Sequence, residues 1–268
     1  MLNLAYEDIP VWTQDNIFSA AHRAGFLKLI NQSKASILGI VPYFAPCFSG
    51  ENVRYFDIFS QDQLRENAKR DPDPVVNPDS IPQIHYHNSD GDMSGIPETF
   101  DIVFSSHCIE HQPDLVWHLQ QVHDLLSPGG TYYILQPDKR FCFDHMRPET
   151  ALGEVIQAAR EKRRRHTLKT LVDHHMLQTH NHAHRHWAGD HTDPGWQDGQ
   201  TAGLQKALDF YDGAEGSYLD AHAWQFTPAR FLQTVVFLNT IGLTDMKPKC
   251  VWPTPADRHE FAAVLVRD

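Results

Sequence analysis

The feature that most constrains the fold is a repeated alternation of short apolar runs with helical patterns before residue 137. Runs of apolar or β-favouring residues occupy 35–41, 52–59, 83–87, 100–107 and 131–137. Nearly continuous apolar runs are typical of strands buried on both faces of a parallel sheet. Strand, helix and strand in repeated order predict an open α/β sheet, which binds ligands beyond the carboxyl ends of its strands.

Helix signals lie between and around these runs. Ser60 with Gln63 three residues later predicts a capping box at the start of a helix over 60–70. Residues 113–130 carry an apolar stripe, and Pro128-Gly129-Gly130 is predicted to end that helix and turn the chain. Thr227-Pro228 predicts a further helix start, before two closing strands near 245–252 and 260–266 that should pair antiparallel.

The chain of 268 residues is long enough for one large domain with an elaboration. We expect a single domain with four parts. These are an N-terminal covering helix within 1–34, a cofactor-side half over 35–137, a His-rich insertion or lid over 138–220, and a C-terminal helix with closing strands over 221–268.

Composition narrows the partners. A net charge of −11 disfavours nucleic acid and anionic lipid as bulk partners. The first residues lack the pattern of a signal peptide, and no window is apolar enough to span a bilayer. Four widely spaced cysteines indicate neither a disulfide framework nor a thiolate zinc site. We therefore expect a cytoplasmic protein, and the sequence indicates no oligomeric state.

The stretch "FDIVFSSHCIEHQPDLVWHLQQVHDLLSPGGTYYILQPD", residues 100–138, resembles the seven-stranded S-adenosylmethionine-dependent methyltransferases. Three further stretches resemble a bacterial subgroup of that family, some members of which occur near polysaccharide-related enzymes: "PDKRFCFDHMRP", "THN…RHWAGDH" and "YLDAHAWQFTP". The resemblance implies a doubly wound, Rossmann-like sheet, mostly parallel with an antiparallel C-terminal strand. It also implies methyl transfer to oxygen or nitrogen of a small-molecule or glycan-like polar acceptor.

The same resemblance exposes an altered cofactor loop in "SILGIVPYFAPCFSG", residues 36–50. Gly39 occupies the position of the family's strand-end acid, Val41 that of the first loop glycine, and Pro42 follows. Losing one charge-assisted hydrogen bond of about 1.5–3 kcal/mol weakens binding roughly 10- to 150-fold. We expect cofactor binding to be weakened or rearranged by this loop.

The resemblance assigns the remaining cofactor contacts to the ends of the next strands. Asp57 should accept the ribose hydroxyls, with Ile58 beside it, and Asn88 or Asp90 should meet the adenine amine. Ser105, at the end of the run over 100–107, should line the methionine moiety.

A histidine cluster follows that run. His107, Glu110 and His111 lie one helical turn apart, so their side chains can converge. The spacing resembles the Glu-x-x-Glu-His arrangement with which RNA 3′-end methyltransferases hold a divalent ion, although polar pocket lining or plain structure would also explain it. His222, two residues after Asp220, is expected to face the same pocket, and His107, His111 and His222 are the candidate general bases.

Seven further histidines fall in one short stretch of the insertion, 174–191, and three of them, His180, His186 and His191, are candidate metal ligands expected to face His107 and His111. Two rival functions therefore accompany the methyltransferase interpretation. One is a binding module that keeps the fold without the cofactor, and the other is a metal-dependent enzyme that uses the His/Asp/Glu pocket.

Overall fold

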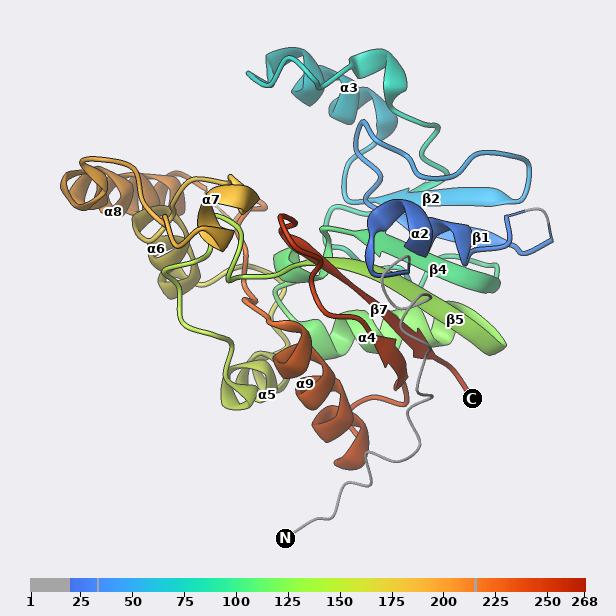
Figure 1. The fold of residues 1–268 in the computed structure, drawn as a ribbon. Helices are drawn as coiled ribbons and strands as arrows, with labels where there is room; N and C mark the ends of the chain where they lie inside the picture. Colours follow the sequence, from blue (N-terminus) through green and yellow to red (C-terminus); the bar gives the residue numbers. More distant parts are fainter. Residues whose placement is uncertain (1–19, 33, 215) are drawn as a thin grey trace, which may run out of the picture.

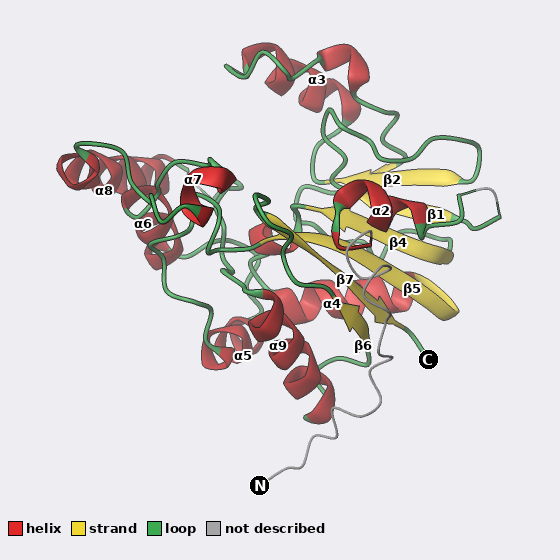
Figure 2. Cartoon of the chain, in the orientation of Figure 1, coloured by secondary structure: helices red, strands yellow, loops and turns green. Residues whose placement is uncertain are grey.

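The computed structural model describes residues 20–32, 34–214 and 216–268. Its seven-stranded sheet has the order β3-β2-β1-β4-β5-β7-β6, and Figure 2 shows it flanked by helices. The strands are β1 (Ile37–Ile40), β2 (Val53–Asp57), β3 (Tyr86–His87), β4 (Phe100–Ser106), β5 (Leu126–Pro137), β6 (Lys247–Val251) and β7 (Glu260–Val266). Strands β1 to β5 pair parallel, whereas β7 pairs antiparallel with β5 and β6. The predicted fold class is confirmed.

Apolar layers cover both faces of the sheet. On one face pack α4 (Leu115–Leu125), α5 (Leu152–Glu161) and α9 (Pro228–Thr240), through buried residues such as Leu119, Val155 and Val235. On the other face lies α2 (Arg23–Lys28), whose Phe26 contacts Tyr133 and Trp252 edge to face. Residues 16–19 of the predicted covering helix lie outside the described residues.

The predicted helix starts are confirmed. The capping box of Ser60 and Gln63 opens α3 (Gln61–Arg70), and the Thr227 hydroxyl accepts from the backbone N–H of Arg230 at the start of α9. Two short 3₁₀ helices, η2 (Pro78–Ser80) and η3 (Ile109–His111), follow α3 and β4 along the chain. No helix among the described residues is both long and apolar enough to cross a membrane.

Two predicted boundaries are wrong. The helix over 113–130 ends at Leu125, and Pro128-Gly129-Gly130 belongs to the first part of β5, not to a separate turn. Between the pairs Phe100–Leu126 and Ile102–Thr131, four residues of β5 face one residue of β4, so they form a bulge in which Gly129 takes a φ of +76°. The run over 83–87 forms only the two-residue strand β3, and residues 83–85 are irregular chain before it.

The region after β5 is more helical than its sequence pattern suggests. Besides α5 it holds α6 (Leu168–Met176), α7 (Ala183–Trp187) and α8 (Trp196–Gly213). Figure 1 shows α6, α7 and α8 beyond the end of the sheet at which β5 finishes. Asp138 and Phe226, which flank this region, pair as an isolated parallel bridge. The region therefore leaves the sheet and returns to it at one place.

Candidate functional site

The loop after β1 has a backbone conformation that normally calls for glycine. Val41 has a φ of +53° and Tyr43 a φ of +41°. A β-branched residue such as valine rarely adopts this left-handed region, which costs an L-residue about 1–2 kcal/mol. Tyr43 is held by a hydrogen bond from its hydroxyl to Asp71 (3.0 Å), and its ring packs beside α3. The loop thus adopts its shape at the expense of backbone strain.

This strain predicts a stabilising substitution. Val41→Gly relieves the left-handed valine but adds about 0.5–1 kcal/mol of unfolded-state entropy. We expect a net gain of about 0.5–1 kcal/mol, or about 1–4 °C in the melting temperature. Val41→Ala, which keeps a Cβ at the same φ, is the matched control. A glycine variant that melts below the alanine variant would contradict the prediction.

Packing explains the glycine at position 39. Gly39 on β1 lies opposite Tyr55 on β2, and a Cβ built on it would come within 2.3 Å of the tyrosine ring. The Tyr55 hydroxyl donates to the carbonyl of Phe48 (2.7 Å) and accepts from its N–H (3.3 Å). Tyr55 therefore crosses the strand where the acid was expected and fixes the far end of the loop.

Asp57, the last residue of β2, is a buried carboxylate that can accept further hydrogen bonds. Its side chain is 1% exposed; Oδ1 accepts from the N–H of Phe59 (3.0 Å), and Oδ2 has no partner in the described part of the chain. Burial raises the pKa of Asp57 to about 6, against the lowering effect of the N–H groups of Phe59 and Ile58. A buried acceptor without a donor normally indicates a missing partner.

The loop after β3 lies next to Asp57. The N–H of Asn88 donates to the Asp57 carbonyl (3.2 Å), and a Cβ on Gly91 would meet Ile58 at 4.0 Å. Asn88 and Asp90 are exposed, and Asn88 Oδ1 accepts from the N–H of Asp90 (2.9 Å). The structure thus brings Asp57, Ile58, Asn88 and Asp90 together at one edge.

Ser105 takes a different place from the one expected. Its side chain is fully buried, and its hydroxyl is hydrogen-bonded to the Tyr132 hydroxyl at 2.6 Å, which in turn meets His118 Nε2 at 2.9 Å. Burial lowers the pKa of His118 to about 4, so this histidine is neutral. The Ser105 hydroxyl is engaged inside the core.

Immediately after β4, His107 turns sharply toward the end of the sheet, with a φ of +52°. Its Nε2 lies 2.9 Å from Glu260 Oε2, at the start of β7. Arg23 binds the same carboxylate through two donors, each at 3.0 Å, and also donates to Ser106. Burial would raise the pKa of Glu260, but His107 and Arg23 outweigh it and lower that pKa to about 2.

Glu110 is the deepest polar group of the cluster. Its side chain is 1% exposed, and neither carboxylate oxygen has a hydrogen-bond partner among residues 20–32, 34–214 and 216–268. Three imidazole nitrogens surround Oε1, namely His107 Nδ1 at 3.8 Å, His111 Nε2 at 3.9 Å and His222 Nε2 at 4.0 Å.

Two of these histidines, His111 and His222, are oriented by other carboxylates. His111 Nδ1 lies 2.8 Å from Asp220, and His222 Nδ1 lies 2.5 Å from Asp144, which also pairs with Arg147 (2.9 Å). Burial would lower the pKa of His111, but the hydrogen bond to Asp220 and the nearby carboxylates outweigh it and raise that pKa to about 9. Asp220 and His222 thus reach one cluster through different partners and do not pair with each other.

These side chains line a cavity of about 100 Å³. Its walls are His107, Glu110, His111, Pro137, Cys142, Phe143, Asn181, His222 and His259. The expectation that His107, His111 and His222 share one pocket is therefore met by the structure. Glu110 and His107 come from the end of β4, and His222 from the chain that returns to the sheet.

The insertion histidines do not join them. In the described chain, His180, His186 and His191 line no part of this cavity and gather instead around His145. His186 Nε2 meets the His180 carbonyl (3.0 Å), and His191 stacks face to face on His145 with ring centroids 3.7 Å apart. The expected convergence of these three histidines on His107 and His111 is wrong, because α7 and its loop form a cluster of their own.

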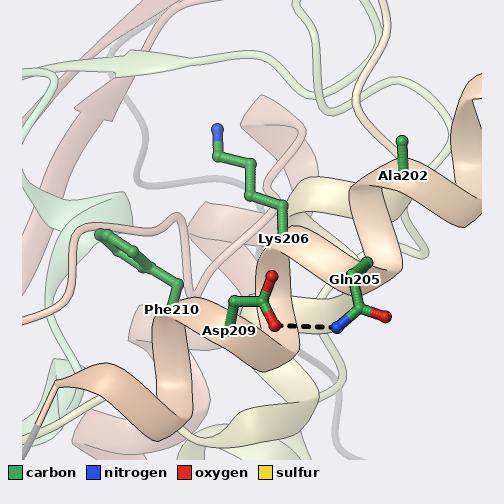
Figure 3. A pocket seen from close by; sticks show the side chains of 5 residues that line it. All are labelled: Ala202, Gln205, Lys206, Asp209 and Phe210. Atoms are coloured by element: carbon green, nitrogen blue, oxygen red, sulfur yellow. Dashed lines mark hydrogen bonds between the residues drawn. The ribbon is translucent and has the colours of Figure 1, made fainter.

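A larger hollow of about 530 Å³ lies along α8. All of its lining residues come from this one helix. Figure 3 shows Gln205 hydrogen-bonded to Asp209 along the helix, whereas Lys206 extends away from both. The hollow therefore brings together no groups from different elements, and we regard the histidine-lined cavity as the functional site.

Several residues of the site were not predicted from the sequence. Asp144, Glu260 and Arg23 orient the histidines, yet each is far from its partner along the chain. Of these, only Asp144 lies in a stretch that the family resemblance singled out, "PDKRFCFDHMRP". Asn181 and Phe143 line the cavity from segments that had no strand or helix signal.

Comparison with known proteins supports one family. The family model described as a methyltransferase domain matches residues 26–188, which is more than half of the chain. No curated protein matches the sequence.

Solved structures with a similar arrangement are methyltransferases of low identity. The CcbJ methyltransferase from Streptomyces caelestis is 12% identical, with 95% of each chain covered and a TM-score of 0.42. An S-adenosylmethionine-dependent methyltransferase from Mesorhizobium loti is 17% identical over 90% of this chain and 96% of that one, with a TM-score of 0.44. The plantazolicin methyltransferase BpumL, in complex with SAH, is 10% identical over 95% and 84%, with a TM-score of 0.44.

The seven-stranded sheet with its antiparallel end and the match over residues 26–188 agree with one another. The chain therefore belongs to the methyltransferase domain family.

Proposed function

We propose that this protein transfers a methyl group from S-adenosylmethionine to an oxygen or nitrogen atom of a small or glycan-like polar acceptor. The observation that carries the proposal is the cavity lined by His107, His111 and His222. It lies at the carboxyl end of β4, the edge of the sheet at which β2 ends in Asp57. A wall of imidazoles suits a hydroxyl or an amine, since it can donate to or accept from either.

The residues at the neighbouring strand ends fit the cofactor. Asp57 Oδ2 is a buried acceptor without a donor in the described chain, as a carboxylate that receives ribose hydroxyls would be. Ile58 and the loop with Asn88 and Asp90 lie beside it, where an adenine ring would need one apolar and one polar neighbour. S-adenosylmethionine carries its methyl group on a sulfonium sulfur. The neutral thioether that forms when the carbon–sulfur bond breaks is a good leaving group.

The loop of Gly39, Val41 and Pro42 then has a shaping role. Because Tyr55 fills the place beside Gly39, no side chain there reaches an ammonium group. The left-handed φ of Val41 and Tyr43 still curves the backbone away from β1. Binding would rest on Asp57 and on backbone groups of this loop more than on a strand-end acid.

Chemistry at the acceptor requires position, exclusion of water and removal of one proton. His107, His111 and His222 are the groups we assign to this side of the site. Each has its other ring nitrogen against a carboxylate, which fixes the ring plane toward the cavity. The buried positions of Glu110 and Cys142 keep the floor of the cavity out of bulk water.

Cofactor affinity should depend on pH through Asp57. A carboxylate accepts two hydroxyl donors only when ionised, and burial raises the pKa of Asp57 to about 6. The dissociation constant for S-adenosylmethionine should be flat above pH 7 and rise below pH 6, approaching about tenfold per pH unit. Calorimetric titrations between pH 5 and 8 measure it. Asp57→Asn should bind weakly with no such slope, and a slope that persists in this variant would contradict the assignment.

A methyl-transfer assay tests the function itself. Purified protein is incubated with S-adenosylmethionine labelled in its methyl group and with panels of sugars, hydroxylated small molecules and amines. We expect label on oxygen or nitrogen of one class and none with Asp57→Ala. Label on carbon would contradict the acceptor type. Folded protein that neither binds the cofactor nor transfers label would instead favour a binding module on this fold.

A further inference from the structure

Glu110 is an unexplained buried charge. Its carboxylate is almost completely removed from solvent and receives no hydrogen bond from the described residues. Transferring an ionised carboxylate into a protein interior is strongly unfavourable unless a cation or several donors compensate it. The cavity beside Glu110 holds no lysine or arginine among its lining residues. With no lysine or arginine in that wall, an ionised Glu110 requires a protonated imidazole or a bound cation beside it.

The imidazoles around Glu110 are too far away to hydrogen-bond it and are spaced as ligands of one ion would be. His111 Nε2 and His222 Nε2 lie 3.9 and 4.0 Å from Oε1, beyond the limit for a hydrogen bond. Two atoms that each lie about 2.0–2.2 Å from the same metal ion are separated by roughly 3–4 Å. One donor atom from each of Glu110, His111 and His222 falls within 4.8 Å of the other two.

The second ring nitrogen of each histidine strengthens this interpretation. His111 Nδ1 meets Asp220 and His222 Nδ1 meets Asp144, so both Nδ1 atoms carry the hydrogen. The remaining nitrogen of each ring, Nε2, lies 3.9 or 4.0 Å from Glu110 Oε1 and becomes a lone-pair donor when a metal ion takes the place of its proton. Metal-binding histidines characteristically donate their other N–H to a carboxylate, which fixes the tautomer and the ring orientation. The two rings stand at 85° to each other and do not stack.

The other two histidine clusters lack these properties. In the cluster of His145, His186 and His191, the His145 and His191 rings stack at 12° with centroids 3.7 Å apart. Lone pairs in two parallel, overlapping ring planes do not meet at one point. In the cluster of His107, His259 and Glu260, both carboxylate oxygens of Glu260 already bind Arg23.

We propose that Glu110, His111 and His222 bind one divalent transition-metal ion at the floor of the acceptor cavity. Two nitrogen donors and one carboxylate favour an ion such as zinc over magnesium or calcium, which prefer oxygen ligands. Three protein ligands leave coordination positions open toward the cavity, as in catalytic metal sites. His107 Nδ1, 3.8 Å from the same Glu110 oxygen, borders the site.

This inference rests on the proposed function and names its acceptor more closely, as a hydroxyl whose oxygen coordinates the ion. Coordination makes a hydroxyl more acidic, so its proton leaves to water before or during the transfer. The acceptor oxygen then forms a bond to the methyl carbon as the carbon–sulfur bond breaks. The products are the methylated acceptor, S-adenosylhomocysteine and one proton. His111 and His222 act as ligands in this scheme.

Metal analysis of the full chain tests the site without any acceptor. Protein purified without chelators is analysed for bound metals, stripped with a chelator, and titrated with zinc and, separately, with magnesium. We expect about one zinc per chain, tight uptake by the stripped protein, and no comparable uptake of magnesium. Stripped, folded protein that takes up no zinc would overturn the proposal, and this result needs no variant.

Variants locate the ion. His111→Ala and His222→Ala should lose stoichiometric zinc, and Asp220→Asn, which removes only the carboxylate behind His111, should weaken zinc binding about 10- to 100-fold. His186→Ala, in the separate cluster, is the matched control and should bind zinc as the wild type does. Zinc that survives in His111→Ala and His222→Ala but is lost in His186→Ala would overturn the assignment.

Cobalt substitution and cofactor titration separate this inference from the proposed function. Cobalt(II) bound by the wild type should give visible absorption bands that His222→Ala lacks. S-adenosylmethionine is titrated into the stripped protein in parallel. Cofactor binding without any zinc uptake would reject the metal and leave methyl transfer in place, whereas zinc uptake without cofactor binding would reject methyl transfer and leave the metal site.

Discussion

Asp57→Ala should lower the affinity for S-adenosylmethionine by at least about 100-fold. The Asp57 carboxylate has one oxygen free of any partner in the described chain, and two ribose hydroxyls would each donate to it. A hydrogen bond to a charged group contributes about 1.5–3 kcal/mol, so losing two costs about 3 kcal/mol or more. Isothermal titration calorimetry of cofactor-free protein measures the change directly.

The stability of this variant separates a binding role from a structural one. Removing a desolvated carboxylate offsets the lost hydrogen bond from Phe59, so we expect the cofactor-free variant to melt close to the wild type. Asp62→Ala, at an exposed position on α3, is the control for a lost acid and should bind normally. Affinity within threefold of the wild type in Asp57→Ala would remove Asp57 from the cofactor site.

Gly39→Ala should destabilise the protein by about 1–3 kcal/mol, although it adds a single methyl group. The new Cβ would lie 2.3 Å from Cε1 and 2.6 Å from Cδ1 of Tyr55, so the ring must move. Moving it breaks the two hydrogen bonds between Tyr55 and Phe48. Thermal or denaturant unfolding should show the loss, with about 2–4 °C in melting temperature for each kcal/mol.

A double-mutant cycle tests this cause. Tyr55→Leu alone should be destabilising because it removes the bonds to Phe48. Adding Gly39→Ala to Tyr55→Leu should then cost much less than Gly39→Ala costs in the wild type, with a coupling of about 0.5–3 kcal/mol. Additive effects would show that the ring does not exclude a side chain at position 39. The same cycle with Gly39→Asp asks whether an acid fits once the ring is gone.

The fold was predictable because its signals are local. Apolar runs such as that over 100–107 mark strands buried on both faces, and the Ser60 capping box marks a helix start within four residues. The start of β5 was not predictable in the same way. Pro128-Gly129-Gly130 is typical of a turn, but pairing with β4 draws these residues into a bulge of the sheet.

The site was predictable only in part, since its geometry depends on contacts between distant segments. The spacing of His107, Glu110 and His111 correctly placed three side chains in one pocket. No local pattern indicates that Glu260 would hold His107 or that Asp144 would hold His222, since 153 and 78 residues separate these pairs. The insertion histidines were misplaced for the same reason, because their direction is set by tertiary packing.

The paired flanks of the region after β5 have a consequence for evolution. Asp138 and Phe226 form a bridge, and the N–H of Lys139 donates to the Phe226 carbonyl, so both junctions sit on one spot of the scaffold. Lengthening, shortening or exchanging the segment between them would leave the order and register of the seven strands untouched. Descendants of such a chain can change this region while inheriting the seven-stranded half unchanged.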